Sequence, residues 1–201
     1  MPDSSAAQLH TLRRSLRQRR RSLDPSWRHT ADRALVNRIH SYGPYLSARR
    51  IALYIAFDGE PDLSPVIRMA QIQGKELYVP HLSGEEMQFV RLAEGARLKR
   101  NLFGIAEPAH TSPIAARFLD LVLTPLVAFD HSGTRLGVGG GYYDRCFEFL
   151  RTRQAWFRPK LVGIGYSFQC APSIARQPWD VPLWAAITEQ AVHRFPRGSH
   201  K

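Results

Sequence analysis

Three largely apolar runs constrain the fold of this chain more than any other feature. They lie at residues 51–57 (IALYIAF), at residues 121–129 (LVLTPLVAF) and at residues 161–166 (LVGIGY). A strand with one face in water alternates polar and apolar residues, whereas a continuous apolar run is typical of a strand covered on both faces. The chain is therefore expected to form layers, with helices packed on a buried sheet.

Helical segments separate these runs. Residues 6–22 carry leucines at helical spacing along one narrow stripe. Asp24 followed by Pro25 is a typical helix start, with the acid as N-cap and proline in the first turn. A Gly-Pro pair at residues 43–44 should end that helix, and a Ser-Pro start predicts another helix over residues 64–74.

Shorter strand patterns complete the alternation of strands and helices. They lie at residues 75–80 (KELYVP), 87–92 (MQFVRL) and 185–188 (AAIT). Strands that alternate with helices favour a parallel sheet. The chain of 201 residues therefore predicts a single domain over residues 1–201, with a three-layer α/β/α fold and a mainly parallel central sheet, Rossmann-like in its layout.

Composition narrows the class of protein. The chain is 44% hydrophobic and 22% charged, and no apolar run approaches 18 residues, so we expect a soluble protein without a transmembrane helix. The net charge of +11 predicts anionic partners, but nucleic acid, an acidic membrane surface and small polyanions all qualify. Cys146 and Cys170 form no metal-ligand or disulfide pattern, which favours a reduced, cytoplasmic setting.

A glycine-rich segment predicts a phosphate site. After the apolar run and a turn come Arg135, four glycines within residues 137–141, two tyrosines and Asp144. Glycines let backbone N–H groups approach an anion, and the helix start that follows adds partial positive charge. Arg135 can neutralise phosphate oxygens, and Asp144 can hold the Mg²⁺ that accompanies a nucleotide. The alternative is a turn closing against a helix, because the loop matches neither common nucleotide fingerprint.

The N-terminal helix carries six arginines. They are Arg13, Arg14, Arg17, Arg19, Arg20 and Arg21. From the residues alone this cluster is either a solvated basic face or a patch for nucleic acid or a membrane. Aromatic residues are not interleaved with the arginines, as stacking on nucleic-acid bases requires, which counts against nucleic acid.

Three segments resemble a known family. TPLVAFD at residues 124–130, GTRLGVGGGYYDR at residues 133–145 and FDGE at residues 57–60 closely resemble segments of the 5-formyltetrahydrofolate cyclo-ligase family. The resemblance implies closure of the formyl group of 5-formyltetrahydrofolate onto N10, giving 5,10-methenyltetrahydrofolate, ADP and phosphate. It implies ATP and Mg²⁺ as cofactors, a folate as the small-molecule partner, no nucleic-acid or membrane partner, and a cytoplasmic monomer.

The resemblance implies a nucleotide site on the glycine loop. In the family a basic N-terminal helix reaches the ATP phosphates, and Arg13 matches its second basic position. Leu9 stands at the first, so that either His10 or Arg14 substitutes or the contact is missing. The residues predicted to bind the nucleotide are Arg13, Arg17, Arg135, Leu136, Gly137, Val138, Gly139, Gly140, Gly141, Tyr142 and Tyr143.

The resemblance also implies a folate site and the catalytic groups. Glu60, the acid of the FDGE segment, would accept N–H bonds from the pterin, which a carboxylate can do in pairs. The residues predicted to bind the folate are Ile55, Glu60, Val138, Gly139, Gly140, Gly141 and Tyr142. Arg135 and Tyr143 are the predicted catalytic residues, with Arg135 stabilising charge on the transferring phosphoryl group.

Metal ligation and one loop complete the implied site. Asp144 is the implied Mg²⁺ ligand, and Asp180 is a second one, although an alternative alignment puts Trp184 at that position. Residues 101–108 (NLFGIAEP) resemble a family segment and are either a loop over the substrate side or an ordinary surface loop. A different small-molecule kinase or ligase with the same phosphate loop is the main rival function.

Overall fold

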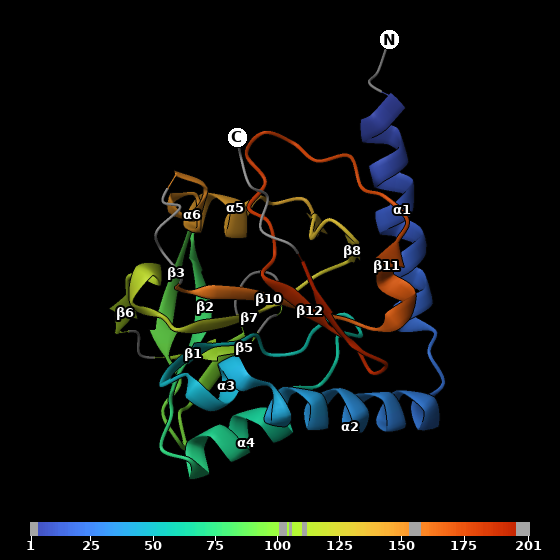
Figure 1. Cartoon of the computed structure of the whole chain (residues 1–201). Helices are drawn as coiled ribbons and strands as arrows, with labels where there is room; N and C mark the ends of the chain where they lie inside the picture. The colour runs from blue at the N-terminus through green and yellow to red at the C-terminus, as the bar shows by residue number, and fades with distance from the viewer. Residues whose placement is uncertain (1–3, 101–103, 105, 110–111, 153–157, 196–201) are drawn as a thin grey trace.

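The computed structural model describes residues 4–100, 104, 106–109, 112–152 and 158–195 (Figure 1). Its centre is an eight-stranded sheet with the strand order β13-β12-β10-β7-β1-β2-β3-β6. The strands of this sheet are β1 (Arg50–Ala52), β2 (Glu76–Ser83), β3 (Glu86–Arg91), β6 (Pro113–Ile114), β7 (Leu121–Pro125), β10 (Lys160–Ile164), β12 (Ala185–Ile187) and β13 (Val192–Arg194).

The five inner strands, β2, β1, β7, β10 and β12, are parallel, and β3, β6 and β13 pair antiparallel at the two edges. The predicted mainly parallel α/β fold is thus confirmed. The Rossmann-like detail is not confirmed. When the five parallel strands are numbered along the chain, their order across the sheet is 2-1-3-4-5, which is the flavodoxin-type order. The direction of winding changes between β1 and β7, where ligands of such sheets bind beyond the carboxyl ends of the strands.

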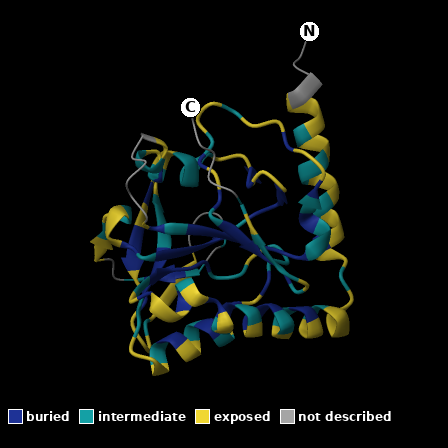
Figure 2. Ribbon diagram, viewed as in Figure 1, coloured by how far each residue is buried: buried dark blue, intermediate teal, exposed yellow. Residues whose placement is uncertain are grey.

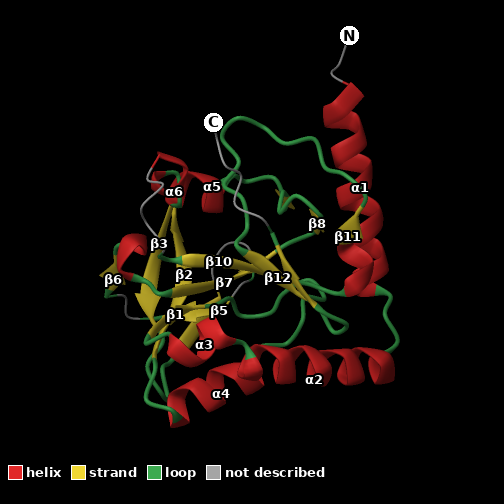
Figure 3. Ribbon diagram, viewed as in Figure 1, coloured by secondary structure: helices red, strands yellow, loops and turns green. Residues whose placement is uncertain are grey.

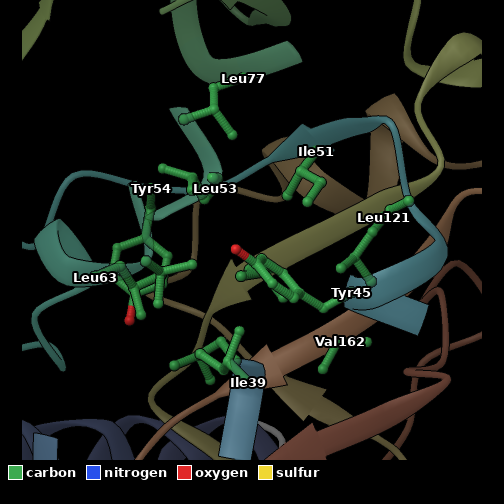
Figure 4. Close-up of a cluster of buried hydrophobic side chains, with 14 of the residues drawn as sticks. Ile39, Tyr45, Ile51, Leu53, Tyr54, Leu63, Leu77, Leu121 and Val162 are labelled. Carbon is green, nitrogen blue, oxygen red and sulfur yellow. The ribbon is translucent and has the colours of Figure 1, made fainter. Parts of the chain in front are cut away.

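Helices α2 (Pro25–Ser41), α3 (Gly43–Ser47) and α4 (Ser64–Ile72) cover one face of the sheet (Figures 1 and 3). Figure 4 shows the core that they close, in which Ile39 and Tyr45 from the helices face Ile51, Leu121 and Val162 from the strands. These side chains are all buried. Figure 2 shows the central strands largely in the dark blue of buried residues. The continuous apolar runs therefore correspond to strands with no wet face.

The opposite face is covered by shorter elements. They are α5 (Tyr142–Cys146), α6 (Phe149–Thr152) and a small sheet of β8 (Ala128–Asp130), β9 (Arg135–Leu136) and β11 (Cys170–Ala171). Phe129, Phe147 and Leu126 pack here against Val122 and Leu161 of the central strands. Two short 3₁₀ turns and a hairpin complete the described elements: η1 (Ala116–Phe118), η2 (Ser167–Gln169), β4 (Leu98–Arg100) and β5 (Ala106–Pro108).

The long N-terminal helix α1 (Ser4–Arg21) stands at the edge of these layers beside β8 and β11 (Figure 1). Its leucine stripe packs on the small sheet, where Leu9, Leu12 and Leu16 contact a cluster that includes Leu136 and Ile174. Within the described part of the chain, no helix has both the length and the apolar character needed to cross a membrane.

Local predictions at the helix starts were partly right. Asp24 caps α2, since its side chain accepts hydrogen bonds from the backbone N–H groups of Ser26 and Trp27. The Gly-Pro pair at residues 43–44 does not merely end that helix. It begins α3, because proline fits the first turn of a helix, where its missing N–H costs nothing.

The strand predicted at residues 51–57 is shorter than expected. Its pairing with β7 ends where Ala52 lies opposite Val122, and the chain beyond bends into a turn at residues 57–60. The apolar residues 53 and 54 remain buried although they lie outside the strand. Continuous apolar character therefore marked burial rather than strand length.

Candidate functional site

A pocket of about 400 Å³ opens between α1, the glycine loop and the segment before β12. We call it the glycine-loop pocket. Its walls are formed by Ala6, Leu9, Arg13, Arg135, Leu136, Gly137, Gly139, Gly141, Asp144, Ile174, Ala175, Gln177, Trp179 and Asp180. The structure thus brings the predicted phosphate loop, one N-terminal arginine and both predicted metal ligands to one place.

Arg135, at the start of β9, is the buried cation of this pocket. Its side chain is 4% exposed, and Nη2 donates a hydrogen bond of 2.8 Å to Oδ1 of Asp144. Nη1 is buried and has no hydrogen-bond partner, a state shared among the described side chains only with Nε2 of His40. An unpaired buried donor is costly, so the geometry favours an anionic ligand beside Arg135.

The glycine loop has a backbone that other residues would strain. Gly139 and Gly141 have φ values of +112° and +65°, in the region that L-residues with side chains rarely adopt. A Cβ on Gly140 would lie 2.8 Å from the ring of Tyr142. The shape of the loop therefore favours glycine at residues 139, 140 and 141, whereas a Cβ on Gly137 would meet nothing within 4 Å. The loop leads directly into the first turn of α5, with Gly141 as its N-cap.

The two predicted metal ligands lie close together. Asp144 Oδ1 accepts a second hydrogen bond, of 3.1 Å, from the backbone N–H of Val181, the residue after Asp180. Asp180 itself accepts the backbone N–H of Gln177 at 2.8 Å. No group of three or more potential metal-binding side chains occurs in the described residues. Two carboxylates nevertheless suit Mg²⁺, which commonly takes one or two from the protein and further oxygens from phosphates and water.

The N-terminal helix reaches the loop through Arg13, whose Nε donates a 3.0 Å hydrogen bond to the carbonyl oxygen of Gly137. Leu9 lines the same pocket one helical turn away. His10 and Arg14 are exposed and do not line it. Arg17 pairs with Asp58 at 2.8 Å and does not line the pocket either. Its predicted nucleotide contact has no support from this geometry and stays a prediction.

The turn at residues 57–60 holds the predicted pterin carboxylate. Glu60 is largely buried, and its Oε2 accepts the backbone N–H of Phe57 at 3.1 Å. Burial raises the pKa of the Glu60 carboxyl to about 7, while the nearby Arg20 guanidinium acts in the opposite direction. The carboxyl therefore changes its charge near neutral pH.

Tyr143 is influenced by both Arg135 of the glycine-loop pocket and Glu60 of the FDGE turn. The guanidinium carbon of Arg135 is 5.2 Å from the centre of its ring. Burial raises the pKa of the Tyr143 hydroxyl far above its ordinary value; Arg135 lowers this pKa and Glu60 raises it further. Since both charges act on the same hydroxyl, Tyr143 links the glycine-loop pocket to the turn that carries Glu60.

Other predicted site residues have different surroundings. Tyr142 points toward the β2–β3 hairpin, where its hydroxyl donates to the carbonyl oxygen of Gly84 at 3.3 Å. Val138 is 64% exposed at the tip of the loop.

Ile55 packs against the core beneath α2 and α4. Trp184 packs against the same core, and its ring faces the ammonium of Lys160, so Asp180 is the pocket residue of the two alternatives.

The segment predicted as a substrate loop is only partly described, because residues 101–103 and 105 lie outside the described residues. A Cβ on Gly104 would lie 3.7 Å from the ring of Phe57, so this segment approaches the turn that carries Glu60. Glu107 is buried and lies 2.9 Å from Nδ1 of His81. The segment thus lies beside the FDGE turn, and its role as a loop over the substrate stays a prediction.

Sequence reasoning missed two residues of this region. Arg20 was grouped with the arginines of the helix surface, yet its side chain is 1% exposed. The FDGE segment predicts no partner for Asp58, yet this residue pairs with Arg17, Arg20 and Arg21. The sequence pattern does not predict this contact, because the arginines lie on one helix and the acid lies in a distant turn.

Comparison with known proteins agrees with the geometry of the site. The model of the 5-formyltetrahydrofolate cyclo-ligase family matches residues 5–189. The chain is 35% identical to the 5-formyltetrahydrofolate cyclo-ligase of Escherichia coli K12 over 186 residues, which cover 88% of this chain and 98% of that protein. Identity to the Haemophilus influenzae protein of the same name is 33%, covering 86% of this chain and 93% of that one.

Solved structures agree as well. The structure of 5,10-methenyltetrahydrofolate synthetase from Aquifex aeolicus superposes with a TM-score of 0.81 at 30% identity, covering 96% of this chain and 95% of that one. The Mycoplasma pneumoniae synthetase gives a TM-score of 0.72 at 26% identity, covering 90% and 98% of the two chains. The glycine loop, its buried arginine and the FDGE turn thus occur in a chain that belongs to the 5-formyltetrahydrofolate cyclo-ligase family.

Proposed function

We propose that this protein uses ATP and Mg²⁺ to convert 5-formyltetrahydrofolate into 5,10-methenyltetrahydrofolate, with release of ADP and phosphate. Its family membership supports the activity, and the observation that carries the detail is Arg135. Nη2 of this buried guanidinium is paired with Asp144, Nη1 has no hydrogen-bond partner, and Arg135 lines the glycine-loop pocket. A phosphate oxygen is a suitable partner for Nη1.

The reaction requires activation of a poor electrophile. An N-formyl group is an amide, and its oxygen does not leave as water near neutral pH. ATP, when bound, supplies the γ-phosphoryl group that makes this oxygen part of a phosphate leaving group, so that N10 of the folate can attack the carbon. The protein contributes mainly positioning and charge stabilisation to such a step.

The residues of the pocket suit these two tasks. Backbone N–H groups of the glycine loop would hold the phosphoryl oxygens, and Arg135 would stabilise the charge that develops on them. Asp144 and Asp180 would hold Mg²⁺ against the phosphates, since both carboxylates line the pocket. No nucleophile from the protein is needed.

The pocket also orients the nucleotide. Its walls divide into a polar part around Arg135, the glycines and the two acids, and an apolar part formed by Ala6, Leu9, Ile174, Ala175 and Trp179. Phosphates belong in the polar part, and the purine ring belongs in the apolar part, where the 58% exposed Trp179 offers a stacking surface. Leu9 then contacts the base, which explains why an apolar residue replaces the basic one at this position.

The folate would lie on the other side of Tyr143. Glu60 would accept N–H groups of the pterin. Tyr143, whose hydroxyl is influenced by the charges of both Glu60 and Arg135, would lie where the formyl oxygen meets the phosphoryl group. Ile55, Val138 and Tyr142 belong to the same proposed folate site. We further propose a small-molecule folate as the only partner, a monomeric enzyme and a cytoplasmic location.

Paired kinetics on two variants test this assignment. Arg135→Ala should abolish turnover while the protein remains folded, as judged by circular dichroism. Glu60→Ala should raise the KM for 5-formyltetrahydrofolate more than the KM for ATP. Equal increases in both KM values would count against a pterin contact at Glu60, and normal turnover in Arg135→Ala would remove Arg135 from the phosphate site.

A further inference from the structure

Arg20 takes no part in the chemistry proposed above, yet it heads the largest fully buried side chains in the described structure. It lies in the last turn of α1, outside the glycine-loop pocket, and is 1% exposed. Burying a guanidinium costs free energy unless its donors are paired. The partners of Arg20 therefore show what its burial holds together.

These partners come from two segments that follow parallel strands. Arg20 Nε donates to the carbonyl oxygen of Asp58 at 3.0 Å, and Nη2 lies 3.3 Å from Oδ2 of the same residue. Nη1 donates to the carbonyl oxygen of Leu126 at 3.1 Å. Asp58 belongs to the chain after β1, and Leu126 follows β7, so Arg20 joins the two strands at which the winding of the sheet reverses.

The turn that Arg20 holds has an uncommon backbone. Asp58 and Gly59 have φ values of +53° and +77°, and the N–H of Glu60 donates to the carbonyl oxygen of Phe57 at 3.0 Å. Such a conformation is costly for a residue with a side chain and persists only where its surroundings enforce it. A Cβ on Gly59 would lie 3.0 Å from the carbonyl oxygen of Arg20, so the turn packs directly on α1.

We propose that Arg20 is a positioning residue that fixes the FDGE turn and keeps the Glu60 carboxylate placed and charged for the pterin of the folate. Arg20 does so from behind the turn, with Nη2 3.9 Å from Oε1 of Glu60. The proposal rests on the proposed function, because it takes Glu60 as the group that binds the pterin.

The electrostatics of Glu60 agree with this geometry. Titratable and charged groups face Glu60 from several elements: Arg17 and Arg20 of α1, Arg28 of α2, Tyr54, Asp58, and Tyr143 of α5. Arg28 reaches only the backbone, where Nη2 donates to the Glu60 carbonyl oxygen at 2.8 Å. Burial raises the pKa of the carboxyl, and Arg20 is the strongest influence that lowers it. Removal of Arg20 therefore raises this pKa further.

The test is the pH dependence of kcat/KM for 5-formyltetrahydrofolate at saturating MgATP, from pH 6 to pH 9, in Arg20→Gln. This ratio reports ionisations of the free enzyme. An increase of about one in the pKa of Glu60 lowers kcat/KM about five-fold at pH 7 but less than about two-fold at pH 9, and the KM for ATP changes little. A merely structural defect would lower kcat/KM equally at both pH values.

Arg21→Gln is the matched control. Arg21 pairs with the same Asp58 carboxylate from the surface of α1, with a side chain that is 57% exposed, whereas Arg20 is the arginine that pairs with Glu60. Its pH profile should coincide with that of the wild type. Arg20→Lys keeps the charge but not the forked set of donors. The pH profile of kcat/KM should keep the wild-type midpoint in Arg20→Lys, while the KM for 5-formyltetrahydrofolate should rise. This variant serves as the test if Arg20→Gln does not fold.

Glu60→Gln separates this proposal from the proposed function. If Glu60 binds the pterin, kcat/KM of this variant no longer falls at acidic pH through ionisation of residue 60. Adding Arg20→Gln to it then causes no further change in the pH dependence of kcat/KM. An unchanged folate KM in Glu60→Gln would overturn the pterin contact itself. A normal effect of Glu60→Gln would overturn only the role of Arg20 if Arg20→Gln showed an unshifted midpoint or, where that variant does not fold, if Arg20→Lys showed an unchanged folate KM.

Discussion

Replacing Glu60 by glutamine should stabilise the unliganded protein at alkaline pH while it weakens folate binding. Burial raises the pKa of this carboxyl from 4.5 to about 7. The folded protein therefore holds the Glu60 proton more tightly than the unfolded chain does, and stability is lost as the pH rises from 4.5 through 7. Glutamine has nearly the same size and polarity but never ionises.

The magnitude follows from the two pKa values. Ionising the buried carboxyl costs about 3 kcal/mol of unfolding free energy at pH 8 and about 1 kcal/mol at pH 5, where most of the folded protein still carries the proton. The attraction of Arg20 is already contained in these figures, because it is one of the influences that set the pKa. Glu60→Gln should therefore be more stable than the wild type toward urea by up to about 3 kcal/mol at pH 8, and by only about 1 kcal/mol at pH 5.

Urea unfolding followed by circular dichroism at pH 5, 6, 7 and 8 measures this difference. Glu148→Gln is the matched control, because the Glu148 side chain is 70% exposed and should give no pH-dependent difference from the wild type. A stability difference between Glu60→Gln and the wild type that does not change with pH would refute the assignment of a buried, near-neutral carboxyl. A less stable variant at pH 8 would refute it more strongly.

Further predictions concern the nucleotide side. Asp144→Asn should lower kcat at least about 100-fold, measured at saturating ATP and folate, because it removes a proposed metal ligand and leaves Arg135 without its charged partner. Gly140→Ala should weaken ATP binding in calorimetry, since its Cβ would lie 2.8 Å from the Tyr142 ring; wild-type affinity would mean that the loop adapts. Trp179→Ala should raise the Kd for ATP about ten-fold, as loss of one stacking contact predicts, and leave the Kd for inorganic tripolyphosphate unchanged. Trp179→Phe should retain most ATP affinity; an equal loss for both ligands in Trp179→Ala would argue against stacking.

The fold could be predicted because its signals are local or repetitive. Continuous apolar runs indicated strands without a wet face, and their alternation with helices indicated a mainly parallel sheet. Gly163 of β10 shows how close this packing is. A Cβ there would lie 2.5 Å from the side chain of Leu126, so only glycine lets that leucine pack on β10.

The candidate site was predictable only where one segment carried several of its parts. Arg135, the glycines and Asp144 lie within ten residues, so their chemistry could be read together. The Arg20 and Asp58 pair lies 38 residues apart, and the burial of one arginine among six depends on which face of α1 meets the turn. Leu9 interrupts the basic pattern of the family, but the structure shows that it lines the glycine-loop pocket and packs on a cluster that includes Ile174.

One measurement tests the central claim most directly. Purified protein is mixed with 5-formyltetrahydrofolate, Mg²⁺ and ATP, and formation of methenyltetrahydrofolate is followed by its near-ultraviolet absorbance, with a control that lacks ATP. The account predicts absorbance that grows only when ATP is present and releases one phosphate for each methenyl group formed. Folded protein that binds ATP but leaves the formyl-folate unchanged would contradict it, and would mean that the same phosphate loop serves another acceptor.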